Sequence, residues 1–380
     1  MWIQSIRRCI RSHSCSGGTR GVCSPAADGS DRLRVLLQLC ADRFYISPGE
    51  SNAELFRRGW SCSYGPLGVE LRGNLLRQWW HSVTGSKERV FGLSTPSGSA
   101  EQRAAGARLV EAEHVQQLLD RSDLNRDQLI QELRGLLLSS PSVRRSLLQG
   151  ALENFVSSLE MVNRKLPFGL AEMGPCFHYS LKLISNGLGS FSQYPKIQVK
   201  IFRVQHTDFS SLTSLHFSQF RDGRKSVPHV VSVSGNIDRG VLAFLSNSLQ
   251  QLRREDSKKR LQQRKVLKLH PVLAPVKVAL DIGKGATVEL RQVCEGLLQE
   301  FLEAKISAWP GYLETLPSSL EHLNAKYDEM GVLFSVVINE NTLESGLLQV
   351  RSRDTTIRET MHISEIRHFL SKYITAADKL

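Results

Sequence analysis

The sequence predicts two folded domains of different classes, an α+β domain followed by an α/β domain. Its 380 residues are enough for two hydrophobic cores, and a content of 41% hydrophobic and 23% charged residues is ordinary for a globular protein. Leucine-rich stripes at helical spacing fill residues 111–165, whereas residues 230–233 have the composition of a strand. Beyond residue 276, strand patterns alternate with amphipathic helix patterns, which is typical of an α/β domain.

The N-terminal segment, residues 1–32, has the composition of a mitochondrial transit peptide. It contains four arginines and no acidic residue before Asp28, and Ile3, Ile6 and Ile10 fall on one face of a short helix. A presequence needs these properties because it acts as a cationic amphipathic helix. A disordered basic tail is the alternative. No apolar run approaches the roughly 20 residues that cross a bilayer, so no membrane span is expected.

The first domain is expected to occupy residues 33–249. It should begin with a helix over residues 32–43, followed by a tight turn and a helix that carries Leu71, Leu75 and Trp79. An insertion over residues 108–165 contains three leucine-rich patterns, which predict helices at residues 111–119, 126–138 and 142–165. A strand at residues 230–233 then leads into a helix that opens at residues 235–240.

The second domain, residues 266–380, is expected to be a mixed five-strand sheet flanked by helices. Its periodicity predicts strands at residues 276–282, 332–338 and 347–353, and helices at residues 287–305 and 318–329 with a last helix capped by Ser364.

Three blocks of sequence resemble class II aminoacyl-tRNA synthetases, the glycyl enzymes in particular. They are Tyr-Gly-Pro-Leu-Gly-Val-Glu-Leu within residues 58–72, Leu-Pro-Phe-Gly-Leu-Ala-Glu-Met-Gly-Pro-Cys-Phe at residues 166–177, and the anticodon-domain-like segments 269–280 and 351–356. The resemblance implies a catalytic-like α+β domain with an antiparallel sheet and a helical insertion. It also implies that the α/β domain resembles an anticodon-binding domain.

The residues that follow Phe177 depart from the synthetase pattern. The enzymes continue with Arg-Asn-Glu, whose arginine holds the ATP phosphate and whose glutamate positions the amino group, whereas this chain has His178 and Ser180 at those two positions. A neutral histidine cannot replace the cationic fork that stabilises charge on phosphate. Arg239 matches the arginine of the third synthetase motif, but Asn236 replaces a glycine there. The chain is therefore expected to be no enzyme, with no catalytic residue, cofactor or metal.

A synthetase scaffold without its catalytic charges is similar to one family, the accessory subunits of the mitochondrial DNA polymerase. Residues 150–153 and 361–364 resemble that family as well, and the resemblance covers about residues 33–178 and 221–380. It implies a processivity factor of the matrix nucleoid that binds the polymerase catalytic subunit and double-stranded primer–template DNA. It also implies a homodimer formed through the insertion 108–165. A working glycyl-tRNA synthetase and a non-catalytic tRNA-binding protein remain alternatives.

Residues 179–220 break the resemblance. The family has more chain there, and these 42 residues are too few for the strands that complete its sheet. The sheet of the first domain is therefore expected to be incomplete, and neither structure nor chemistry is assigned to this segment.

The densest positive charge lies between the domains, where residues 250–265 are expected to form a basic linker or loop. The chain has a net charge of +12, and residues 250–268 contribute eight basic against two acidic side chains. Contacts with duplex DNA would be to phosphates, without reading sequence. A solvated linker is the alternative. The predicted DNA-binding residues are Arg253, Arg254, Lys258, Lys259, Arg260, Arg264, Lys265 and Lys268.

Overall fold

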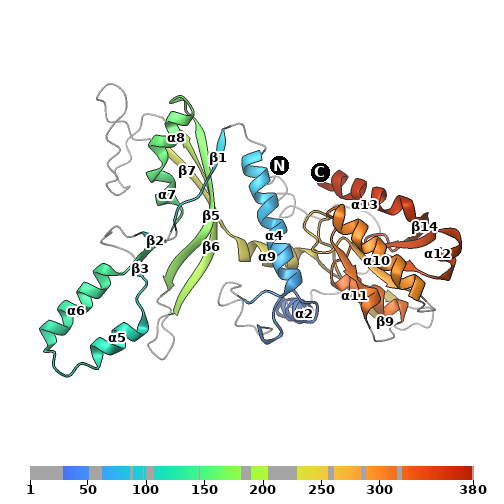
Figure 1. Cartoon of the computed structure of the whole chain (residues 1–380), viewed down its shortest axis with the longest axis horizontal. Coiled ribbons are helices and arrows are strands. Elements are labelled where there is room, and N and C mark those ends of the chain that lie inside the picture. Colours follow the sequence, from blue (N-terminus) through green and yellow to red (C-terminus); the bar gives the residue numbers. More distant parts are fainter. Residues whose placement is uncertain are drawn as a thin grey trace. The chain divides into compact units, whose positions relative to one another are not determined.

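The computed structural model describes residues 29–50, 62–85, 89–96, 98–99, 107–144, 146–180, 190–203, 229–255, 261–283, 288–314 and 319–378. The chain forms two compact units (Figure 1). The first unit joins residues 1–78 with residues 239–380, and the second consists of residues 79–238. The predicted boundary near residue 250 therefore does not follow the contacts within the chain. Most of the predicted transit peptide, residues 1–28, lies outside the described residues.

The second unit is built on a four-stranded sheet in the order β1-β5-β6-β7. β1 runs parallel to β5, and the other neighbouring strands are antiparallel. The segment for which the sequence predicted no element, residues 179–220, therefore contributes a strand. The bounds are β1 (Val90–Leu93), β5 (Phe168–Ser180), β6 (Ser190–Arg203) and β7 (His229–Asn236).

Two short helices, α7 (Leu148–Glu153) and α8 (Phe155–Met161), pack against this sheet. Their buried apolar side chains form one cluster with Phe168 and Leu170 of β5. The rings of Phe155 and Phe168 stack with their centroids 5.7 Å apart. The core of the unit thus lies between these helices and one face of the sheet.

The prediction of one continuous helix over residues 142–165 is wrong. Ser142 and Val143 form β4, which pairs with β2 (Gly98–Ser99) and β3 (Ala107–Arg108). Asn154 then separates α7 from α8, and its side-chain amide donates to the carbonyl of Gly150 at 2.9 Å. Asparagine interrupts helices in this way because its side chain hydrogen-bonds to nearby backbone groups.

The other two predicted helices of the insertion are confirmed as α5 (Ala112–Leu119) and α6 (Arg126–Ser139). Asn125 and Gln128 form a capping box at the start of α6, since each side chain accepts from the backbone N–H of the other. The two helices follow each other with a short connection, so they form a helical hairpin.

The first unit contains the expected mixed five-strand sheet, in the order β11-β10-β12-β13-β14. β10 is parallel to both β11 and β12, whereas β13 is antiparallel to its two neighbours. The strands are β10 (Val278–Ile282), β11 (Ala308–Pro310), β12 (Phe334–Ile338), β13 (Leu347–Ser352) and β14 (Arg358–His362), and the helices are α10 (Val288–Glu303), α11 (Leu320–Glu329), α12 (Glu340–Ser345) and α13 (Ile363–Asp378).

Among the described helices, none is long and apolar enough to cross a membrane.

The helices α2 (Gly29–Asp42), α4 (Pro66–Trp80) and α9 (Ile237–Ser248) belong mainly to the same unit. The fully buried Tyr45 donates its hydroxyl to the carbonyl of Met330 at 2.9 Å. Arg43 forms an ion pair with Glu329 at 2.7 Å. These contacts between distant parts of the sequence explain why the N-terminal helix joins the C-terminal sheet in one unit.

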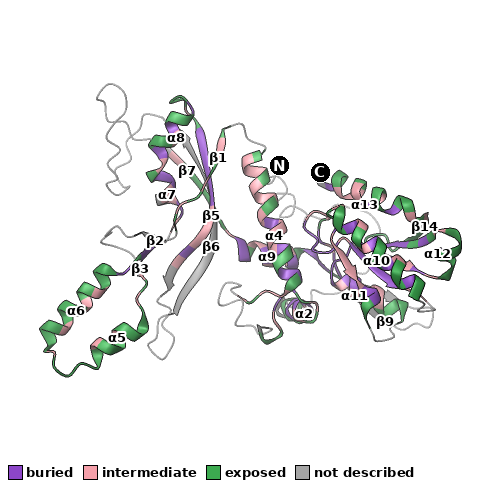
Figure 2. Cartoon of the chain, viewed as in Figure 1, coloured by how far each residue is buried: buried purple, intermediate pink, exposed green. Residues whose placement is uncertain are grey.

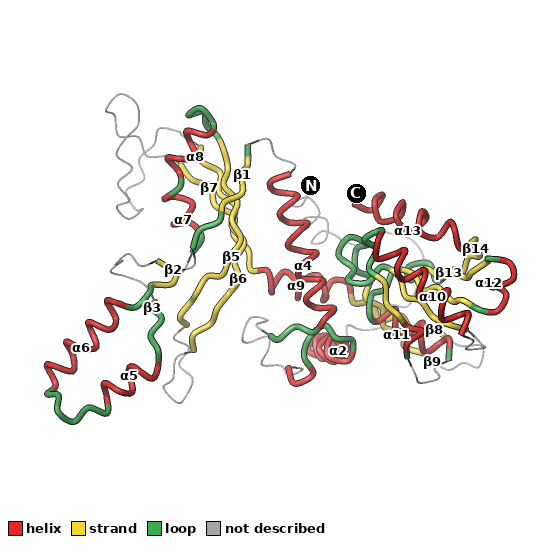
Figure 3. The backbone as a smooth tube through the Cα atoms, in the orientation of Figure 1, coloured by secondary structure: helices red, strands yellow, loops and turns green. Residues whose placement is uncertain are grey.

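The predicted basic linker is a β-hairpin of β8 (Leu249–Glu255) and β9 (Leu261–Leu267), visible as two strands next to α11 in Figure 3. Residues 256–260, which connect the strands, lie outside the described residues. Leu249, Val266 and Leu267 are buried, so the base of the hairpin is part of the core of the first unit.

Candidate nucleic-acid interface

The eight predicted DNA-binding residues are distributed along this basic hairpin, residues 249–268. Arg253 and Arg254 lie on β8, and the structure describes their backbone but not their side chains. Lys258, Lys259 and Arg260 fall outside the described residues. The three remaining residues, Arg264, Lys265 and Lys268, lie on β9 or directly after it.

Arg264 is occupied by an ion pair within the protein. Its Nε donates to Oδ2 of Asp328 at 2.8 Å, and its Nη2 lies 2.5 Å from the same oxygen. The carboxylate of Asp328 is buried and also binds Arg351. Arg264 therefore has a structural role, whereas Lys265 and Lys268 are half-exposed and make no ion pair among the described residues.

The synthetase-like strand β5 carries a buried acidic residue, Glu172, that the sequence analysis did not single out. Arg144 Nη1 donates to Glu172 Oε1 at 2.7 Å and to the hydroxyl and carbonyl oxygens of Thr95, each at 2.8 Å. Arg144 Nε donates to the carbonyl of Pro175 at 2.9 Å. A Cβ on Gly174 would collide with Arg144 Nη2, so only glycine leaves room for this guanidinium.

The two residues that replace the catalytic arginine and glutamate also lie on β5. His178 pairs with Ser192 of β6, and Ser180 pairs with Ser190. Their side chains lie outside the described part of the structure. Asn236 has a local structural role, since its Oδ1 accepts from the backbone N–H of Asp238 at the start of α9 at 2.9 Å.

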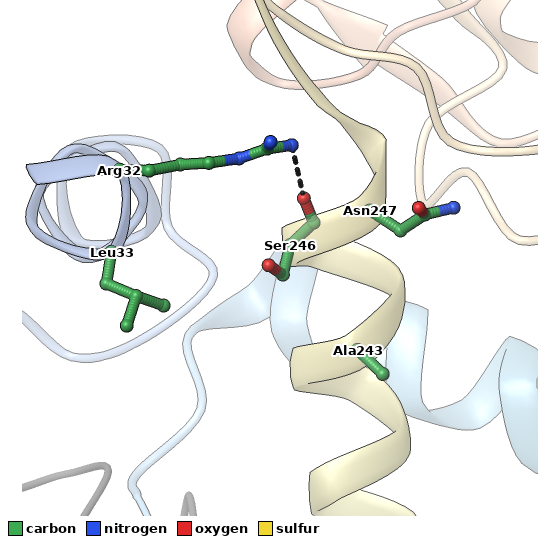
Figure 4. Close-up of a pocket in the computed structure, with 5 residues that line it drawn as sticks. All are labelled: Arg32, Leu33, Ala243, Ser246 and Asn247. Atoms are coloured by element: carbon green, nitrogen blue, oxygen red, sulfur yellow. Dashed lines mark hydrogen bonds between the residues drawn. The ribbon is translucent and has the colours of Figure 1, made fainter. Parts of the chain in front are cut away.

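A shallow pocket lies between α2 and α9 in the first unit (Figure 4). Its only charged lining residue, Arg32, donates to the carbonyls of Ser246 and Leu249 at 3.1 and 3.0 Å. Because these backbone carbonyls engage the guanidinium, this pocket offers little to a ligand.

The helical hairpin α5–α6 is exposed along both helices (Figure 2). Leu119 is 54% exposed and Leu138 is 55% exposed, and neither helix contains a buried residue. Since apolar side chains on a helical hairpin are usually covered, this surface is the candidate interface with another protein chain.

The fold and its domains define a protein of the class II aminoacyl-tRNA synthetase type. The family described as "Anticodon binding domain" matches residues 273–373, which contain the whole five-strand sheet. Glycine–tRNA ligase of Thermobifida fusca is 22% identical over 467 aligned positions that cover 90% of this chain and 98% of that protein. The synthetase-type fold predicted from the sequence is therefore confirmed.

Two further relatives are much more similar. DNA polymerase subunit gamma-2 of Mus musculus is 40% identical over 452 positions that cover 98% of both chains. The mitochondrial DNA polymerase subunit gamma-2 of Xenopus laevis is 40% identical over 420 positions, covering 91% of this chain and 88% of the relative. The chain belongs to the DNA polymerase subunit gamma-2 family. Since the alignment with the mouse protein is longer than the 380 residues of this chain, the mouse protein has residues that this chain lacks.

Proposed function

We propose that the chain is a non-catalytic accessory subunit of the mitochondrial DNA polymerase, which raises processivity by holding the catalytic subunit on primer–template DNA. The observation that carries the proposal is the 40% identity to DNA polymerase subunit gamma-2 over nearly the whole chain. Simultaneous binding to polymerase and DNA lowers the rate of dissociation, because both partners must be released at the same time.

The loss of synthetase activity follows from the residues of β5. His178 and Ser180 supply neither the guanidinium nor the carboxylate that adenylate formation uses. The guanidinium of Arg144 and the buried carboxylate of Glu172 bind each other in this region. The purified protein should therefore show no glycine-dependent exchange between ATP and pyrophosphate, and exchange above that of a heat-inactivated control would support the enzyme instead.

DNA binding is assigned to the basic residues of the hairpin other than Arg264. Residues 253–260 contribute five basic side chains, and Lys265 and Lys268 extend the charge toward the base. Contacts with phosphates add affinity without sequence preference. Arg264 is left out of this set because Asp328 already binds it.

Two surfaces are assigned to protein partners. The exposed α5–α6 hairpin would pair with the same hairpin of a second copy around a two-fold axis, because such an interface is self-complementary. The α/β domain beyond Val276 would bind the catalytic subunit. Location in the mitochondrial matrix nucleoid is supported by the N-terminal segment, which is basic and has no acidic residue before Asp28, and by the mitochondrial relative.

A competition pull-down distinguishes this function from tRNA binding, which the match to an anticodon-binding domain favours as the second candidate. The immobilised full-length chain is offered the polymerase catalytic subunit and bulk mitochondrial tRNA, separately and together. The accessory-subunit proposal predicts retention of the catalytic subunit at roughly physiological salt, which tRNA does not displace. Retention of tRNA without the catalytic subunit would contradict it.

A further inference from the structure

We infer that Asp328, Arg351 and Arg353 form a clamp that holds the basic hairpin in one orientation on the C-terminal sheet. Arg351 and Arg353 belong to the segment Arg-Ser-Arg-Asp-Thr-Thr, residues 351–356, which resembles part of an anticodon-binding domain in sequence. The clamp follows from the hydrogen bonds within the chain. The bearing of the clamp on DNA, through the basic residues of the hairpin, rests on the proposed function.

Asp328 forms the centre of the clamp. It lies in α11, is 1% exposed, and accepts from Arg351 through both oxygens, at 3.1 Å to Oδ1 and 3.0 Å to Oδ2. Arg264 of the hairpin also donates to Oδ2, through its Nε at 2.8 Å. One buried carboxylate thus pairs with a cation of β13 and with a cation of β9, and this shared partner joins the two strands. Charge-assisted hydrogen bonds of this kind are stronger than neutral ones.

Arg353 holds the chain where it leaves the hairpin. Its side chain is almost completely buried, and its guanidinium donates to the carbonyls of Leu267 and Leu269 at 3.1 and 2.9 Å. It also donates to the carbonyl of Gly331 at 2.9 Å. Arg353 therefore links the last residue of β9 to the turn after α11, next to Asp328.

Because of where Arg264 lies along the hairpin, its bond to Asp328 fixes the orientation of the hairpin on the C-terminal sheet. Leu252 and Arg264 face each other across the two strands, and they are the pair nearest the tip whose side chains the structure describes. Leu252 is 40% exposed, whereas Val266 and Leu267 nearer the base are fully buried. Arg264 therefore attaches the hairpin to α11 at the point where the buried residues of the hairpin give way to exposed ones.

The segment of Arg351 and Arg353 resembles an anticodon-binding domain, but the burial of both side chains separates them from nucleic acid. Both guanidinium groups are engaged by acceptors of this protein, so neither offers a free fork to a phosphate. Their positive charge helps to position the hairpin, and the DNA contacts are assigned to other basic residues of the hairpin.

Hydrogen–deuterium exchange of the full-length chain tests the clamp. Arg264→Met removes the hairpin side of the clamp but leaves the buried Asp328–Arg351 pair intact. We expect the amides of residues 250–255 to exchange roughly fivefold faster or more, while amides of β10 and β12 stay within about twofold of wild type. Lys265→Met is the matched control, since it removes the adjacent charge of the same strand without touching Asp328, and it should leave exchange unchanged.

Arg264→Lys provides the conservative rescue, because an ammonium group retains the charge facing Asp328. Its exchange should lie between those of wild type and Arg264→Met, which keeps the test informative if the methionine variant does not fold. Unchanged exchange in Arg264→Met, or equal acceleration in Lys265→Met, would overturn the clamp. Duplex binding is measured on the same samples. If wild type binds no duplex, the proposed function fails while the exchange data still decide the clamp.

Discussion

Arg144 Nη1 lies 2.7 Å from Glu172 Oε1, and the hydroxyl of Thr95 donates to the same carboxylate oxygen at 2.5 Å. Glu172 is 2% exposed and belongs to the strand that resembles the second synthetase motif. A buried carboxylate needs a partner, because desolvation of an isolated charge is costly. In this chain Arg144 supplies that partner, so the charge of Glu172 is compensated within the protein.

Replacement of Arg144 should be strongly destabilising. Arg144→Met leaves the Glu172 carboxylate buried without its cation, which costs about 3 to 5 kcal/mol of unfolding free energy in comparable cases. Arg164→Met is the control, since the Arg164–Glu160 pair is exposed and separated by 3.6 Å, and exposed pairs contribute about 0 to 1 kcal/mol. Urea denaturation measures both. Equal effects of the two substitutions would show that the buried pair has no special role.

Asp281 should make stability depend on pH. Burial is the main cause that raises the pKa of this carboxyl to about 6 from an ordinary value of 3.8, although the hydroxyl of Tyr327 donates to it at 2.7 Å and lowers it. The folded state therefore binds a proton more tightly than the unfolded state between these two pH values. The stabilisation from this group is present below about pH 4 and is lost as pH rises through about 6.

Asp281→Asn tests this dependence, because the amide oxygen still accepts from Tyr327 while the charge is removed. The variant should gain stability relative to wild type between about pH 4 and pH 7, by up to about 3 kcal/mol for a shift of this size. Glu321→Gln, an exposed change in the first turn of α11, should show no such trend. Urea denaturation measures the unfolding free energy at each pH. If the difference in unfolding free energy between Asp281→Asn and wild type is constant over this range, the expectation is refuted.

The dimer interface should be disrupted when charge is placed on the α5–α6 hairpin. Leu119→Arg combined with Leu138→Arg puts two cations into the proposed interface, while both positions are exposed within one chain. Light scattering should then give the 42.6 kDa mass of one chain in place of twice that mass. Leu343→Arg with Leu347→Arg, exposed in the first unit, should remain dimeric. A dimer that survives the first pair of changes would place the interface elsewhere, and a monomeric wild type would exclude it.

The C-terminal sheet could be predicted because its central strands are apolar. β10 and β12 are almost entirely buried, so their largely apolar runs give a strong signal. β14, with the sequence Arg-Glu-Thr-Met-His, was missed because it is an exposed edge strand without apolar alternation. β11 has three residues and α12 has six, which is too short for periodicity to appear. In this part of the chain, local pattern thus predicts the buried strands and misses the short or polar elements.

The candidate site could be predicted from charge density but not residue by residue. Arg264 looked equivalent to its basic neighbours, yet its partner Asp328 lies 64 residues further along the chain. The Arg144–Glu172 pair, whose members are 28 positions apart, left no spacing signal either. Only the tertiary fold separates the cations that are bound within the protein from those that are exposed.

The basic residues 258–260 of the hairpin should make duplex binding depend on salt concentration. Lys258→Ala, Lys259→Ala and Arg260→Ala together remove three potential phosphate partners, and the change spares Arg264. The slope of log affinity against log salt should flatten by up to roughly 0.9 for each phosphate that is no longer neutralised, equally for duplexes of unrelated sequence. Lys305→Ala, Arg358→Ala and Lys372→Ala, exposed in the same unit, serve as control. Fluorescence anisotropy over a salt series measures both sets. Identical slopes for both would leave the hairpin tip without a role in binding.

Primer extension under single-binding conditions tests the central claim most directly. The polymerase catalytic subunit is bound to a long primed template with or without this chain, and a DNA trap added with the nucleotides prevents rebinding. The accessory-subunit account predicts products several-fold longer in the presence of the chain. It also predicts that the gain shrinks at higher salt for the three-alanine variant of the hairpin tip, because fewer phosphate contacts remain. Products of equal length with and without the chain would contradict the account.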